Sequence, residues 1–127
     1  MHGSLSIRFS DARWQVVFSG LICSVGLLVL SAGVTAAEDA RYRVIKELGE
    51  LNGIALQCRY IDQVRRMKAA VVLNAPKERS FGLAFDEATN RSFLAFIEEQ
   101  AVCPHPEAFE RQVGHQVDAL QAAFSTH

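Results

Sequence analysis

A long run without charged residues, residues 14–37, constrains this chain more than any other feature. Arg8 and Arg13 precede the run, and it ends in the small residues Val-Thr-Ala-Ala. A positively charged start, an apolar centre and a small-residue end are the layout of a cleavable export signal. The sequence therefore predicts a signal peptide over residues 1–37, with cleavage after Ala36 or Ala37.

Removal of that segment leaves one helical domain over residues 38–127, long enough for a single small core. We expect this domain to be periplasmic, or secreted, after cleavage. The alternative is an uncleaved anchor, because the uncharged run just reaches the roughly 20 residues that cross a bilayer. In that case the protein is attached to the inner membrane with its helical domain in the periplasm, and only then do we expect a membrane partner.

Composition narrows the function classes that the chain allows. Half of the residues are hydrophobic, 21% are charged and the formal net charge is −1, which excludes a disordered chain and a basic nucleic-acid binder. Two histidines, His105 and His115, and Glu110 are the only hint of a metal site, and two ligands on an exposed helix do not complete one. We expect no metal, no cofactor and no nucleic-acid partner, and we assign no catalytic residue.

Two cysteines remain after the signal, Cys58 and Cys103. Two cysteines in an oxidising compartment usually form one bridge. The sequence contains no Cys-x-x-Cys, which excludes a thioredoxin-like redox site and a c-type haem. We therefore predict a structural disulfide between Cys58 and Cys103, joining the middle of the first helix to the end of the second.

Hydrophobic periodicity predicts an all-α fold, a small antiparallel three-helix bundle. The helices are expected over residues 39–74, 76–101 and 106–124, with breaks at Pro76 and at the Pro104–Pro106 segment. Gly49 and Gly53 weaken the first helix, so we expect a kink near them. Their spacing of four also fits the alternative, a close approach by another helix. Each helix has one apolar face: Val44, Leu48, Leu51, Ala55 and Cys58; Phe81, Phe85, Ala88, Ser92 and Phe96; and Phe109, Val113, Val117, Leu120 and Phe124.

A second apolar stripe on the first predicted helix exceeds what an outer helix of a small bundle needs. It is either covered within the chain or used to bind a partner, and we interpret it as a partner-binding face consisting of Leu56, Tyr60, Val64, Met67 and Val71. A weaker second stripe on the next helix comprises Leu83, Leu94, Ile97 and Ala101.

Charge is divided along the chain, with basic residues concentrated in residues 59–79 and acidic residues in residues 80–110. Helices with complementary solvated faces explain this division. The alternative is a basic patch that recruits an acidic partner or an anionic membrane surface, formed by Arg59, Arg65, Arg66 and Lys68.

These patterns favour a non-enzymatic periplasmic helper that binds another protein or a second copy of itself, as a chaperone, assembly factor or accessory subunit. One alternative is a membrane-anchored accessory subunit. A third is a small exported helical enzyme that, like the secreted chorismate mutases, holds an anionic substrate with arginines and a lysine. Arg59, Arg66 and Lys68 would supply those cations, although their spacing does not match that family.

Overall fold

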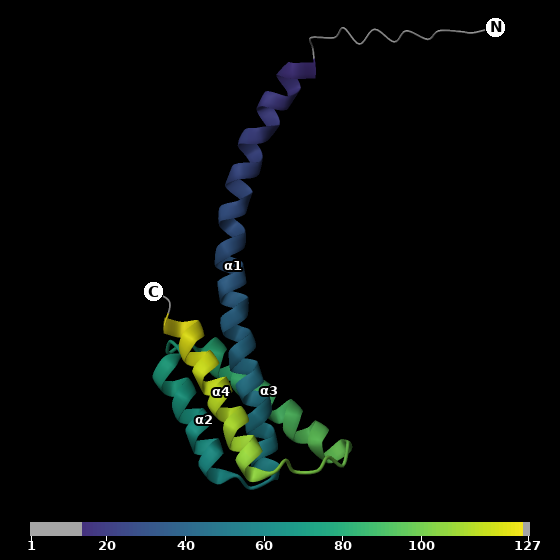
Figure 1. Cartoon of the computed structure of the whole chain (residues 1–127), viewed down its shortest axis with the longest axis vertical. Coiled ribbons are helices and arrows are strands. Elements are labelled where there is room, and N and C mark those ends of the chain that lie inside the picture. The colour runs from purple at the N-terminus through teal and green to yellow at the C-terminus, as the bar shows by residue number, and fades with distance from the viewer. Residues whose placement is uncertain (1–13, 126–127) are drawn as a thin grey trace, which may run out of the picture. The chain divides into compact units, whose positions relative to one another are not determined.

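A computed structural model of the chain describes the backbone of residues 14–125 and the side chains of residues 35–125. The described part is all-α, with four helices rather than three: α1 (Trp14–Gln57), α2 (Ile61–Asn74), α3 (Arg79–Glu98) and α4 (Pro106–Ser125) (Figure 1). The chain divides into two compact units, Met1–Thr35 and Ala36–His127. The second unit, called here the helical unit, contains every buried residue that the structure describes, from Val44 to Phe124.

The predicted signal peptide falls on residues whose side chains, except at its last few positions, lie outside the described part. Within the part that the structure describes, none of the helices has the length and apolar character needed to cross a membrane.

The first predicted helix is interrupted at residues 58–60, not at its glycines. Arg59 adopts a left-handed conformation with φ of 58°. The Tyr60 N–H donates to the Ala55 carbonyl and the Arg59 N–H to the Leu56 carbonyl, the two hydrogen bonds of a Schellman motif. The chain thereby reverses direction, so the stripe that follows Tyr60 turns inward. The prediction of one helix over residues 39–74 was wrong because this helix end contains neither glycine nor proline.

Gly49 and Gly53 lie within α1 where α3 crosses it. A Cβ at Gly49 would lie 2.6 Å from the Phe85 carbonyl oxygen, and one at Gly53 would lie 2.6 Å from the Thr89 carbonyl oxygen. The two backbones are therefore in contact at this crossing, which only glycine permits. α1 continues through both glycines, and the alternative interpretation of their spacing, a close approach by another helix, is confirmed.

α1 and α3 run in one direction and α2 and α4 in the other. Phe81 stacks near Tyr42 and Phe85 lies beside Gly49, so residue numbers increase together along α1 and α3. α2 packs along α4, with the Tyr60 and Phe109 rings 5.3 Å apart at the start of both helices. The predicted inward stripe of α4 is confirmed, because Phe109, Val113, Val117, Leu120 and Phe124 are all buried.

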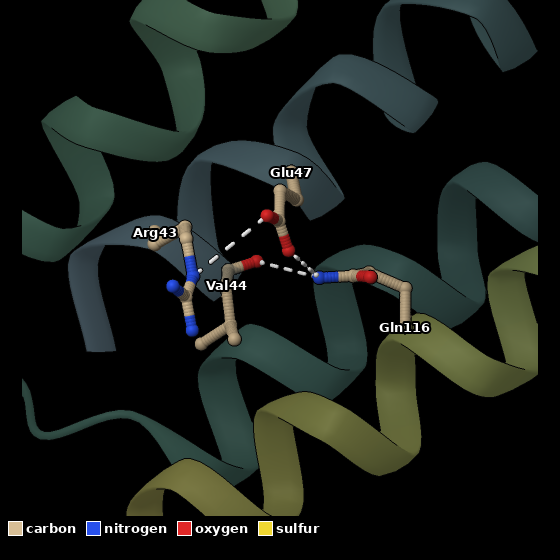
Figure 2. A network of polar contacts seen from close by, with 4 residues as sticks. All are labelled: Arg43, Val44, Glu47 and Gln116. Carbon is tan, nitrogen blue, oxygen red and sulfur yellow. Dashed lines mark hydrogen bonds and ion pairs between the residues drawn. The ribbon is translucent and has the colours of Figure 1, made fainter. Parts of the chain in front are cut away.

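A polar network joins α4 to α1 at the edge of this core (Figure 2). The Gln116 side-chain amide donates to Glu47 Oε2 at 2.8 Å and to the Val44 carbonyl at 3.4 Å. Arg43 lies 3.9 Å from Glu47 on the same helix. These contacts fix α4 along the helical unit's part of α1.

Candidate binding surface

The predicted disulfide is confirmed and defines one end of the helical unit. Cys58 and Cys103 are bonded, with their Cα atoms 5.6 Å apart. Cys58 lies just after α1 rather than in its middle, and Cys103 lies in the loop between α3 and α4. The Tyr60 hydroxyl donates to the Pro104 carbonyl in the same loop. A covalent bond and a hydrogen bond therefore hold the loop that follows α3, and such a bond is typical of proteins in an oxidising, extracytoplasmic compartment.

The last turns of α3 contain five consecutive apolar residues that the fold does not fully enclose. Residues 93–97 read Phe-Leu-Ala-Phe-Ile, and none of the five is buried. Leu94 and Ile97 are 56% and 53% exposed, and Val102 in the following loop is 89% exposed. A helix that is hydrophobic all round is normally buried. We call Leu94, Phe96, Ile97 and Val102 the α3 apolar end.

A cavity of about 350 Å³ opens beside the α3 apolar end. Ile54 of α1, Phe109 of α4 and Phe96 and Val102 contribute apolar walls, and Glu99 and Gln112 contribute polar groups. The disulfide-bonded loop supplies one wall, since Ala101, Val102 and Pro104 all line it. The site is thus an apolar hollow bounded by a helix end and a loop of fixed position.

One carboxylate, that of Glu99, lines this hollow. Residues 92–110 contain four glutamates and neither lysine nor arginine. Glu98 ends α3 and Glu99 caps it, and both are exposed. Carboxylates at a helix C-terminus face the negative end of the helix dipole, which is unfavourable by about 0.3–1 kcal/mol each. The free protein gains no stability from this placement, whereas a cationic ligand would offset it.

The stripe predicted as a partner-binding face packs mainly inside the folded chain. Val64 is buried and Met67 is 0% exposed, while Tyr60 and Val71 are half-buried against the core. Only Leu56 is exposed. Most of this stripe is covered within the chain, because the turn at residues 58–60 rotates α2 so that this face meets α4.

The predicted basic patch does not converge on one cavity. Arg65 lies 3.9 Å from Asp62 on the surface of α2, and Arg66 lies against α4 near Gly114. Arg59 lines a separate cavity of about 250 Å³ together with Asp62, Gln63 and Glu110, and neither Arg66 nor Lys68 lines it. The arrangement needed by the enzyme alternative, three cations around one anionic substrate, is not formed by these residues.

Among the described residues, no group of three or more His, Cys, Asp or Glu side chains is placed to hold a metal ion. Asn52, 1% exposed, donates to the Thr89 hydroxyl at 3.2 Å across the α1–α3 crossing. This buried pair fixes the crossing of the two helices rather than forming an accessible site.

Two exposed apolar positions were not identified as surface sites from the sequence. Val72 and Leu73, at the end of α2, are 70% and 81% exposed. Their position just before the Asn-Ala-Pro break could have predicted this exposure, since a residue in the last turn of a helix has few neighbours to cover it.

The molecule described so far belongs to the class of small, disulfide-bonded, all-α proteins. A scan against protein-family models finds no match, and searches of curated proteins and of solved structures find none either. Its function is therefore argued from its own surfaces.

Proposed function

We propose that this chain is a non-enzymatic exported helper that binds another protein through the α3 apolar end. The exposure of Leu94, Ile97 and Val102 at the end of α3 is the observation that carries this proposal. Exposed apolar patches bordered by polar residues mark protein interaction sites. The disulfide-bonded loop between α3 and α4 also supports this proposal. Because the loop is fixed before a partner binds, less conformational entropy is lost on association.

The partner is a helical segment with apolar anchors flanked by lysine or arginine. Leu94 and Ile97 supply apolar contact on one side of α3, and Phe96 and Val102 line the cavity, which accepts one large side chain. Glu98 and Glu99 at the end of α3 supply the complementary charge, which selects a basic segment over an acidic one.

Fluorescence anisotropy with two labelled peptides of equal length tests this function. One is an amphipathic Leu/Lys helix, and the other has every lysine replaced by glutamate. We expect the Leu/Lys peptide to bind and the Leu/Glu peptide to bind at least about tenfold more weakly. The double variant Leu94→Ser with Ile97→Ser is expected to weaken binding of the Leu/Lys peptide by at least about tenfold.

Leu83→Ser is the matched control, because Leu83 is an exposed leucine at the other end of α3. Its binding should equal that of the unaltered protein. Equal affinity for both peptides, or full affinity in the Leu94→Ser/Ile97→Ser variant, would contradict the proposed function.

A further inference from the structure

A second exposed apolar surface lies at the opposite end of α3. Val72 and Leu73 project from the last turn of α2, and Pro76 in the next loop is exposed as well. α3 begins beside this loop at Arg79, and Leu94 and Ile97 of the α3 apolar end lie about 22–27 Å further along it. We call Val72, Leu73 and Pro76, together with the exposed cations Lys68, Lys77 and Arg79, the α2 tip.

The α2 tip is basic as well as apolar. Residues 63–79 contain five lysines and arginines and one carboxylate, Glu78. Lys68 lies one helical turn before Val72, so the cation and the apolar side chain share a face of α2. In the described part of the chain, the ion pairs involve Arg43, Arg65 and Arg91 and none of the tip's cations.

The chain enters the helical unit at this same end. Arg41 lines a cavity of about 200 Å³ with Asn74, Ala75, Pro76 and Phe124. The Arg41 side chain also donates to the Ala123 carbonyl and lies 5.5 Å from the centre of the Phe124 ring. Figure 1 shows the last turns of α2 and α4 together at this end.

The uncharged run of the sequence ends at residue 37, four residues before Arg41. Helical residues advance 1.5 Å each, so this point lies only about 6 Å along α1 from the residue that contacts the α2–α3 loop. Glu38 and Asp39 lie between them. Residue 37, which belongs to the helical unit, is therefore about 6 Å along α1 from Arg41, and Arg41 shares a cavity with Pro76 of the α2 tip.

We infer that the α2 tip contacts an anionic membrane surface. Val72 and Leu73 insert at the level of the lipid headgroups, and Lys68, Lys77 and Arg79 attract anionic lipid, the combination by which peripheral proteins bind membranes. The contact is weak and reversible after the signal is removed, because two apolar side chains bury little area. It is strengthened by tethering if the uncharged run is retained. The α3 apolar end is then directed away from the membrane, toward soluble partners.

Tryptophan fluorescence tests this inference cleanly, since the sole tryptophan of the chain, Trp14, precedes the helical unit. The unit Ala36–His127 holds all described core residues and the disulfide, and a cooperative melt confirms its fold before use. Leu73→Trp places one reporter at the α2 tip, and Ile97→Trp places the control reporter at the α3 apolar end. Vesicles contain brominated phosphatidylcholine with or without about 30% phosphatidylglycerol.

We expect bromine to quench Leu73→Trp on anionic vesicles and to leave Ile97→Trp unchanged. The charge reversal Lys77→Glu with Arg79→Glu should weaken binding by at least about tenfold. The control Lys46→Glu with Arg111→Glu has the same net charge and should bind as the unaltered unit does, since neither residue belongs to the α2 tip. Binding no stronger to anionic than to neutral vesicles, or equal quenching at both reporters, would overturn the inference and leave the α2 tip as a protein-binding surface.

Discussion

Two glycines of α1 set the distance between α1 and α3, and their environments differ sharply from that of Gly82. At Gly49 and Gly53 an added methyl group meets backbone atoms of α3 that no side-chain rotation can remove. At Gly82, within α3, a Cβ would have no neighbour within 4 Å. The same substitution therefore has opposite consequences at positions that the sequence alone does not distinguish.

Gly53→Ala is expected to lower the free energy of unfolding by about 1–3 kcal/mol, because α1 and α3 must separate to admit the methyl group. Gly82→Ala is the matched control and should raise it by about 0.5–1 kcal/mol, the usual gain when alanine replaces glycine in an exposed helix. Urea unfolding of both variants measures the difference. A stabilised Gly53→Ala variant would indicate that the close crossing is absent.

Residue spacing identified Gly49 and Gly53 as special but left two explanations open. A spacing of four places both glycines on one helix face, which suits either a weakened helix or a contact. The contact depends on small residues of α3, such as Ala88, arriving opposite them. The tertiary fold determines which helix packs against the two glycines. Periodicity within one segment cannot predict that contact.

At the level of the elements, the apolar stripes predicted α4 correctly and misplaced the end of α1. The stripe from Phe109 to Phe124 is buried along its length. The α1–α2 break relies on Arg59 in a left-handed conformation, where glycine is the usual residue. Arginine has a high helix propensity, so a helix that ends at Arg59 cannot be recognised from its amino-acid composition. The same turn explains why the Met67 stripe belongs to the core.

The disulfide joins these elements, and its removal has an expected energetic cost. Cys58 and Cys103 enclose a sequence separation of 45 residues, so in the chain-entropy model the bond stabilises the fold by about 4 kcal/mol. The double variant Cys58→Ser with Cys103→Ser should unfold at lower urea concentration than the oxidised protein. Added reductant should shift the unaltered protein toward the variant and leave the variant unchanged. An unaltered midpoint in reductant would count against a structural role.

At the level of the whole molecule, the arrangement of surfaces could not be read from the sequence. The division of charge between residues 59–79 and 80–110 was visible there. The sequence did not show that Lys77 and Arg79 lie beside exposed apolar residues at the α2 tip. It also did not show that Glu98 and Glu99 lie beside the α3 apolar end. The core was predictable because burial follows helix period, whereas exposed apolar residues are recognised only after the fold shows what remains uncovered.

Processing of the whole chain gives a final prediction, since the helical unit does not need the preceding segment for its core. The first buried residue that the structure describes is Val44, so cleavage after Ala36 or Ala37 removes no described core contact. Cleavage also leaves Glu38 and Asp39 in the first turn of the shortened α1, where carboxylates stabilise the helix dipole by about 0.3–1 kcal/mol each. Protein recovered from the periplasmic fraction should therefore begin at Ala37 or Glu38 by intact mass. Full-length chain recovered from membranes would instead support the anchored alternative.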